Sequence, residues 1–269
     1  MTIAKPHRRL RRGAYLLPSL FTFGNILLGF YAVVCGVRGQ FYEAAWMILI
    51  AGVADGLDGR IARLTGTESE FGREFDSLAD VLTFGAAPAY LAYLWGGDRF
   101  ERLSWVIPLF FLLCTAVRLA RYNVQTKTVD SRSFVGLPSP AAAGSIACIL
   151  FLREQLELRP SDGFDLIILI GLYAALVLFG ALMISTFRYP SFKRLDLRER
   201  RSYRSAMLIA VVLLLLAVEP ELFFQSLAVI YVLWGPGSWL LGRRRRRRSA
   251  PSTASEPATA DAGPTAPTS

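Results

Sequence analysis

Long apolar runs dominate the chain, and short polar segments separate them. A helix needs about 20 residues to cross the roughly 30 Å hydrocarbon core of a bilayer. The apolar runs predict eight membrane spans, at 15–37, 41–57, 75–96, 103–120, 136–152, 164–187, 205–218 and 221–241. Every span should be helical, because lipid offers no hydrogen-bond partner to an open strand edge. The pattern therefore predicts an all-α integral membrane protein, a polytopic bundle of about eight transmembrane helices (a six-helix core plus two).

Composition and charge extend this prediction to orientation. The chain has 269 residues, of which 53% are hydrophobic, and its mean hydropathy is +0.39. Lysine and arginine accumulate on the cytoplasmic side of membrane proteins, and with an inner N-terminus 25 of the 30 basic residues fall in inner segments. We therefore expect a multi-pass protein of the cytoplasmic membrane with both termini facing the cytoplasm. The first apolar run has no small-residue cleavage site and further spans follow it, so we do not expect a secretory signal peptide.

Three regions differ in composition. They are a basic N-terminal arm over 1–14, a transmembrane domain over 15–242, and a tail over 243–269 that follows the last span and opens with six arginines. The arginine run predicts a topological anchor that also attracts anionic lipid. The rest of the tail is rich in Ala, Pro, Ser and Thr, which predicts disorder. Topology thus explains the net charge of +9, and no nucleic-acid partner is expected.

Cysteine and histidine offer little chemistry. Cys35, Cys114 and Cys148 lie in apolar segments without a CxxC spacing, which favours buried apolar roles over a disulfide framework or a zinc site. The one histidine, His7, lies in the basic arm. The body of the chain therefore contains neither a Ser–His–Asp triad nor a histidine metal cluster.

One charged stretch interrupts the apolar pattern, VADGLDGRIARLTGTESEFGREFDSLAD over residues 53–80. Asp55 and Asp58 are three residues apart near the end of the second predicted span, and Asp76 and Asp80 are four apart in the third. Both spacings put the side chains on one helical face, so two antiparallel helices can bring four carboxylates together. Such a cluster needs counter-charge. Mg²⁺ and Mn²⁺ bind carboxylate oxygens and bridge them to substrate phosphates.

A plainer reading treats these aspartates as solvated helix-end charges paired with the arginines of the same stretch. That reading suits a single aspartate, but four in this register favour function, because ionisable groups facing a bundle interior are costly. The glycines point the same way. Gly56, Gly59 and Gly72 are unfavourable in helices, by up to about 1 kcal/mol each relative to alanine. They are expected where a bulky ligand approaches the backbone closely.

The stretch resembles the signature of the CDP-alcohol phosphotransferase family, D-x-x-D-G-x-x-A-R-x8-G-x-x-x-D-x-x-x-D, in every fixed position. The matching residues are Asp55, Asp58, Gly59, Ala62, Arg63, Gly72, Asp76 and Asp80. The resemblance implies an enzyme with two divalent cations, Mg²⁺ or Mn²⁺. The implied metal ligands are Asp55, Asp58, Asp76 and Asp80, and Asp80 is also the implied proton acceptor. The residues expected to bind CDP-diacylglycerol are Gly59, Arg63, Ser69, Gly72, Arg73, Thr22 and Asn25.

Three further stretches resemble the bacterial and archaeal CDP-diacylglycerol–serine O-phosphatidyltransferases of this family. They are LLPSLFTFGNILLGFYAV (16–33), RLARYN (118–123) and FVGLPSPAAAG (134–144). The likeness covers roughly residues 14–190 and implies transfer of a phosphatidyl group from CDP-diacylglycerol to L-serine. Arg118 and Arg121 are candidates to bind the serine carboxylate through a guanidinium fork, although topology alone also accounts for them. Ser139 is an open candidate for contact with the amino acid.

Alternatives to this reaction stay open. We expect the acyl chains of the substrate to lie in lipid with the cytidine at the cavity mouth, and a homodimer is an option because such bundles often pair. The nearest alternative changes the acceptor to glycerol 3-phosphate or an inositol phosphate, which needs a larger basic pocket than RLARYN supplies. A membrane transporter is a remote alternative, because transporter sites lie near the midplane on broken helices. A scaffold that has lost activity is disfavoured by the complete signature.

Overall fold

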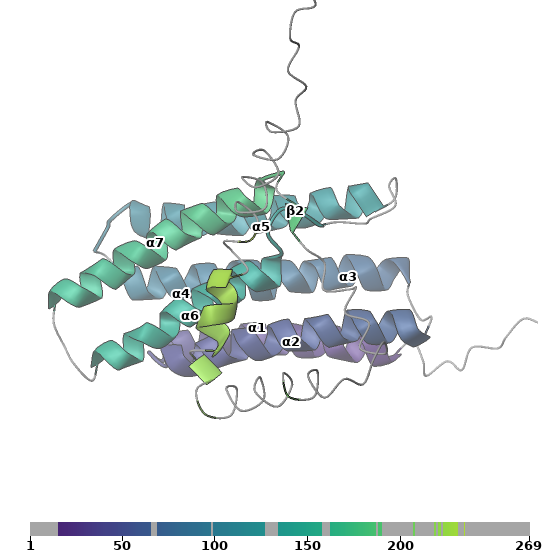
Figure 1. Cartoon of the computed structure of the whole chain (residues 1–269), viewed down its shortest axis with the longest axis horizontal. Coiled ribbons are helices and arrows are strands. Elements are labelled where there is room, and N and C mark those ends of the chain that lie inside the picture. Colours follow the sequence, from purple (N-terminus) through teal and green to yellow (C-terminus); the bar gives the residue numbers. More distant parts are fainter. Residues whose placement is uncertain are drawn as a thin grey trace, which may run out of the picture.

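The described part of the chain is almost entirely helical (Figure 1). The computed structural model describes residues 16–65, 69–97, 99–126, 134–157, 162–186, 188–189, 207, 218, 220–221, 223–230 and 234. The elements are α1 (Leu16–Val37), α2 (Phe41–Thr65), α3 (Glu70–Asp80), the π-helical segment η2 (Val81–Ala86), α4 (Ala87–Gly96), α5 (Leu103–Thr126), β1 (Phe134–Val135), α6 (Ser139–Glu157), α7 (Asp162–Ile184) and β2 (Arg188–Tyr189). Residues 223–230 are also helical. Because α3, η2 and α4 follow one another without a break, they form one long helix.

Each of the first six predicted spans corresponds to one long helix. α2 and α5 continue past the predicted ends at 57 and 120, because the residues that follow include good helix formers such as Ala, Leu, Arg and Gln. Among the described residues, four segments are long and apolar enough to cross a membrane: Leu20–Val37, Glu70–Gly96, Leu103–Val124 and Asp165–Ile184. The predicted spans 205–218 and 221–241 lie largely outside the described residues. A total of eight spans therefore stays a prediction.

The outer face of α1 shows why this bundle belongs in a membrane. Leu20, Phe23, Leu27 and Phe30 recur at helical spacing and are between 60% and 68% exposed. A continuous apolar stripe of this kind is rare on the surface of a soluble protein. In a bilayer the same stripe contacts lipid. Together with the four apolar segments, it identifies the chain as a membrane protein.

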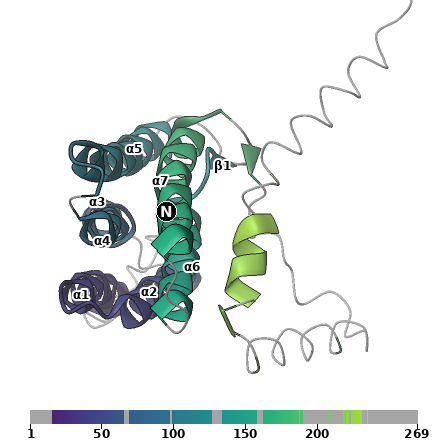
Figure 2. The same ribbon diagram turned by 90° about the vertical axis from the view of Figure 1, so that its left-hand side faces the viewer.

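The helices pack around the long helix formed by α3, η2 and α4 (Figures 1 and 2). α1 contacts α2, α2 contacts α6, α6 contacts α7, and α7 contacts α5, while η2 contacts α1, α2, α5 and α6. α2 and α6 each carry buried alanines, and such small residues allow neighbouring helices to approach closely. They are Ala44, Ala45 and Ala51 of α2 and Ala142, Ala143 and Ala147 of α6. The packing brings the second half of α2 and the α3–η2 junction beside the start of α6.

A short two-stranded ladder fixes the segment that leads into α6. β1 pairs antiparallel with β2, in the register Phe134↔Tyr189 and Val135↔Arg188. Gly136 follows with φ +86°, and a Cβ there would lie 2.3 Å from the carbonyl oxygen of Met183, so only glycine fits. This two-residue ladder is the one departure of the described residues from the predicted all-α architecture.

Candidate active site

Three aspartates from two helices converge where α2 passes the α3–η2 junction. Asp55 belongs to α2, and Asp76 and Asp80 lie on successive turns of α3. One carboxylate oxygen from each lies within 4.8 Å of the others. Asp80 is 8% exposed, and Asp76 Oδ1 is buried with no hydrogen-bond partner among the described residues. This set of oxygen donors, one of them buried and unpartnered, fits a hard divalent cation, which would also relieve the repulsion between the carboxylates.

The structure places the remaining signature residues of α2 only in part. The backbones of Asp58, Gly59 and Arg63 belong to α2, but the side chains of Asp58 and Arg63 lie outside the described residues. Their roles as metal ligand and nucleotide contact therefore stay predictions. Gly56 lines the cavity described below, and a Cβ at this position would meet nothing within 4 Å. The backbone of α2 is thus accessible from the cavity at Gly56, and the approach of a ligand to it stays a prediction.

Asn25 of α1 holds the carboxylate of Asp80. Its side chain is fully buried, and Nδ2 donates a hydrogen bond to Asp80 Oδ1 at 3.4 Å. The hydroxyl of Thr83 in η2 donates to the backbone carbonyl of Asn25 at 3.0 Å. Gly29 lies one turn further along α1, and a Cβ there would come within 2.6 Å of Thr83 Oγ1. α1 therefore lies against η2 at close to backbone contact.

The π-helical segment η2 begins directly after Asp80. A π-helical turn carries an extra residue, so it shifts the direction of the side chains that follow it, and such turns are frequent at functional sites. Here η2 sends Thr83 toward α1 while Asp76 and Asp80 on the preceding turns point toward Asp55. Thr22, predicted to contact the substrate, lies one turn before Asn25 and is 5% exposed.

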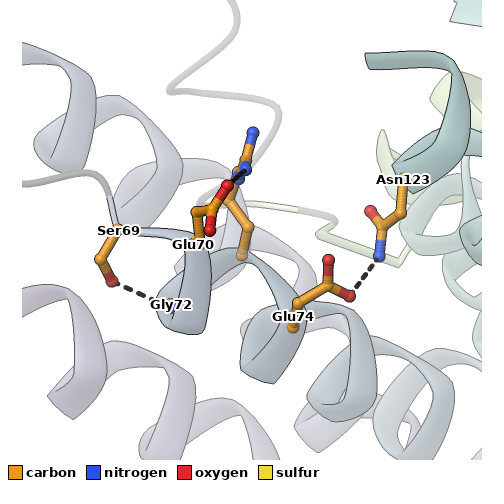
Figure 3. A network of polar contacts seen from close by, with 6 residues as sticks. Ser69, Glu70, Gly72, Glu74 and Asn123 are labelled. Atoms are coloured by element: carbon orange, nitrogen blue, oxygen red, sulfur yellow. Dashed lines mark hydrogen bonds and ion pairs between the residues drawn. The ribbon is translucent and has the colours of Figure 1, made fainter. Parts of the chain in front are cut away.

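The start of α3 uses three of the predicted nucleotide contacts for local structure (Figure 3). Ser69 is the N-cap, and its Oγ accepts a hydrogen bond from the backbone nitrogen of Gly72 at 2.9 Å. A Cβ on Gly72 would lie 3.0 Å from that oxygen, so glycine makes room for the cap. Arg73 forms an exposed ion pair with Glu70 at 3.8 Å, which contributes little stability. Binding of CDP-diacylglycerol by these residues stays a prediction.

Asn123, the last residue of the RLARYN stretch, ties α5 to α3 (Figure 3). Its Nδ2 donates to Glu74 Oε2 at 3.1 Å and to Ser77 Oγ at 3.0 Å. Both partners lie within two residues of Asp76, so this network sets the position of the turn that carries the carboxylate. No role for these three residues was predicted from the sequence. The one signal for Asn123 is its place in the RLARYN stretch, close to Arg118 and Arg121.

A cavity of about 660 Å³ connects the carboxylates to α5 and α6. Its polar end includes Asp55, Asp80, Arg118 and Ser139. Arg118 is 8% exposed and Ser139 is fully buried, and Arg118 Nη1 donates to Ser139 Oγ at 3.0 Å. The guanidinium is thus fixed beside the carboxylate cluster, where it also interacts electrostatically with Asp55. This arrangement brings a carboxylate-binding group next to candidate metal ligands.

Arg121 has a different environment from Arg118. Its Nη1 donates to the carbonyl of Ile184 at 2.9 Å, and its Nη2 donates to the carbonyl of Ser185 at 3.4 Å. These carbonyls belong to the C-terminal end of α7, where a basic side chain is stabilising. Of the two predicted acceptor-binding arginines, Arg118 lines the described cavity and Arg121 stabilises the end of α7.

The three cysteines are buried and free, as predicted from their apolar surroundings.

Comparison with known proteins yields one family and several relatives. A family model described as CDP-alcohol phosphatidyltransferase matches residues 15–187. A CDP-diacylglycerol–serine O-phosphatidyltransferase of Helicobacter pylori is 37% identical over 226 residues, which cover 84% of this chain and 92% of the relative. A Methanocaldococcus jannaschii protein with the same name is 33% identical over 78% of this chain and 90% of its own length. An archaetidylserine synthase of Methanothermobacter thermautotrophicus is 34% identical over 65% of this chain and 69% of its own length.

Proposed function

The chain belongs to the CDP-alcohol phosphatidyltransferase family, and from that premise we propose that it is an enzyme of phospholipid biosynthesis. It transfers the phosphatidyl group of CDP-diacylglycerol to the hydroxyl of L-serine, giving phosphatidylserine and CMP. The observation that carries the proposal is one cavity that joins Asp55 and Asp80 to the buried pair Arg118–Ser139. The names of the relatives from Helicobacter pylori and Methanocaldococcus jannaschii support the same donor and acceptor.

The aspartates are proposed to bind the metal ions that act on the CDP group. Two divalent cations, Mg²⁺ or Mn²⁺, would bind Asp55, Asp76 and Asp80, whose carboxylate oxygens converge, with Asp58 as the fourth predicted ligand. When bound, these cations would neutralise the pyrophosphate and stabilise the CMP leaving group. The predicted contacts to the rest of CDP-diacylglycerol are Thr22, Asn25, Gly59, Arg63, Ser69, Gly72 and Arg73.

Asp80 is proposed as the base. The serine hydroxyl oxygen bonds to the phosphorus that bears the diacylglycerol, the bond from this phosphorus to the CMP oxygen breaks, and Asp80 takes the hydroxyl proton. The hydrogen bond from Asn25 orients one oxygen of this carboxylate. A direct transfer is the simplest scheme, because the signature contains no spare nucleophile.

Arg118 is proposed to bind the acceptor. A guanidinium binds a carboxylate through two parallel hydrogen bonds, which fixes the orientation of serine as well as its charge. Ser139 holds Arg118 in place through their shared hydrogen bond. Among the described lining residues the basic ones are Arg60 and Arg118, and Arg60 is exposed. This suits the single carboxylate of serine better than the additional dianionic phosphate of glycerol 3-phosphate or an inositol phosphate.

The membrane setting of the reaction follows from the charge distribution. With 25 of 30 basic residues on the inner side, the protein lies in the cytoplasmic membrane with its termini and its site facing the cytoplasm. Serine and CMP are water-soluble and exchange at that face, whereas CDP-diacylglycerol reaches the site from the bilayer. Pairing into a homodimer stays a prediction.

Acceptor competition tests the proposal directly. Purified protein in lipid nanodiscs is incubated with CDP-diacylglycerol and, in turn, L-serine, glycerol 3-phosphate or inositol 1-phosphate, and CMP release is measured with and without Mg²⁺ or Mn²⁺. We expect release that depends on both serine and a divalent cation. Release with glycerol 3-phosphate and none with serine would assign the alternative acceptor.

A further inference from the structure

The cavity continues past its polar end into an apolar lobe. Six residues line this lobe: Ile48, Leu49, Cys148, Phe224, Leu227 and Ala228. The packing of α2 against α6 shows which way the lobe runs. Gly52 lies beside Pro140, and Leu49 lies beside Gly144. The two helices are therefore antiparallel, and the cavity extends along α6 from Ser139 to Cys148. At 1.5 Å per residue this distance is about 13 Å, directed away from the end of the bundle that carries the aspartates.

The helix formed by residues 223–230 supplies one wall of this lobe. Figure 2 shows it in light green beside α6. Gln225 Nε2 donates to the carbonyl of Cys148 at 3.3 Å, and the ring of Phe224 packs edge-on against Trp46 at 6.1 Å. These contacts fix the helix against both α2 and α6. It lies beyond residues 15–187, the part of the chain that matches the family model.

We infer that the apolar lobe binds an acyl chain of the lipid donor, and that the helix at 223–230 limits which chains fit. The inference rests on the proposed function, because it identifies the donor as CDP-diacylglycerol. A molecule with a charged headgroup and long apolar chains matches a single cavity with a charged end and an apolar end. A volume of about 660 Å³ also lies in the range of small-molecule sites. One chain of the donor thus enters the protein, in contrast to the expectation that both remain in lipid.

The expected effect of the lobe is to orient the lipid donor, with little gain in hydrophobic free energy. The bilayer is as apolar as the lobe, so moving a chain between them changes the hydrophobic free energy little. A chain held between α2, α6 and the 223–230 helix instead restricts the position of the headgroup, which places the reacting phosphorus near Asp80. A donor whose chains are too short to occupy the lobe should gain nothing from it.

A matched pair of variants tests this role. Ala228→Phe fills the lobe, whereas Val229→Phe changes the next residue, which is 58% exposed and is not among the lining residues. Serine-dependent CMP release is measured with dipalmitoyl and dihexanoyl CDP-diacylglycerol. We expect Ala228→Phe to lower kcat/KM about tenfold for the dipalmitoyl donor and less than twofold for the dihexanoyl donor, with Val229→Phe equal to wild type on both. Equal losses on both donors, or no loss on either, would overturn the inference.

Photo-cross-linking tests the binding of the acyl chain directly. It requires neither catalytic activity nor a folded variant. The wild-type chain is irradiated with CDP-diacylglycerol that carries a photoreactive diazirine near the end of one palmitoyl chain, and labelled peptides are identified by mass spectrometry. The inference predicts labels on Cys148 and on residues 224–228. Labels confined to the lipid-facing stripe of α1 would contradict it. Labelling of the lobe in a protein that releases no CMP with serine would refute the proposed reaction and leave the chain-binding lobe in place.

Discussion

Replacing Gly29 by alanine tests the close approach between α1 and η2 that positions Asp80. The new Cβ would lie 2.6 Å from Thr83 Oγ1 and 2.8 Å from Thr83 Cα. The second of these atoms is backbone, so a change of rotamer cannot relieve the overlap, and α1 must move away from η2. That movement stretches the hydrogen bond from Thr83 to the carbonyl of Asn25 and the contact of Asn25 with Asp80. Both stability and catalysis should therefore decline.

Gly24→Ala is the matched control, because it is the same substitution in the same helix and its Cβ would meet nothing within 4 Å. Both substitutions share the helix-propensity gain of up to about 1 kcal/mol. Their difference therefore isolates the steric term, which for overpacking is about 1–3 kcal/mol. At roughly 2–4 °C per kcal/mol for a chain of this size, Gly29→Ala should melt several degrees below Gly24→Ala.

The assay is thermal unfolding in nanodiscs, followed by CMP release at a temperature where both variants are folded. We expect Gly24→Ala to match or exceed the wild-type melting temperature and to keep wild-type activity. We expect Gly29→Ala to be less stable and less active. Equal melting temperatures for the two variants would refute the close contact between α1 and η2.

The remaining predictions concern individual side chains. Asp80→Asn should reduce serine-dependent CMP release by about 10²–10⁴-fold while CDP-diacylglycerol binding survives; near-normal turnover would remove Asp80 from the role of base. Arg118→Lys should raise KM for serine about 10–100-fold, since a charge-assisted hydrogen bond contributes about 1.5–3 kcal/mol. Arg121→Lys should lower the melting temperature and leave KM for serine unchanged. If Arg121→Lys raised KM for serine and Arg118→Lys only lowered the melting temperature, Arg121 would be the serine-binding residue. Asn123→Ala, which removes the side-chain hydrogen bonds to Glu74 and Ser77, should lower the free energy of unfolding by about 1–2 kcal/mol in denaturant titration; unchanged stability would show that the α3–α5 link is dispensable.

The helices and the carboxylate cluster were accessible from the sequence because both depend on local regularities. Apolar length alone locates the long helices, and helical spacing puts Asp76 and Asp80 on one face. That Asp55 meets them follows once the two helices are neighbours. For the described residues these expectations agree with the structure, and the side chain of Asp58 lies outside them.

The supporting contacts were not accessible, because they join helices that are distant in the chain. Asn25 and Asp80 are 55 residues apart, and Ser77 and Asn123 are 46 apart. No periodicity in the sequence indicates which turns of two such helices meet, nor that a π-helical segment follows Asp80.

Residues with the same predicted role also have different surroundings in the structure. Gly56 and Gly72 both suggested close approach of a ligand, yet Gly56 borders open space and Gly72 makes room for the Ser69 cap. Arg118 and Arg121 are one helical turn apart, yet one lines the cavity and the other binds the carbonyls at the end of α7. Such differences depend on the neighbouring helix, which the pattern of a single segment does not specify.

The central claim is that Asp55, Asp76 and Asp80 together hold divalent cations. Titration of the purified chain with Mn²⁺, followed by electron paramagnetic resonance of the free ion, measures this without any turnover. The account predicts saturable Mn²⁺ binding by the wild type that Mg²⁺ displaces, and a lower affinity for Mn²⁺ in Asp55→Asn, Asp76→Asn and Asp80→Asn. Unchanged Mn²⁺ binding in all three variants would contradict it.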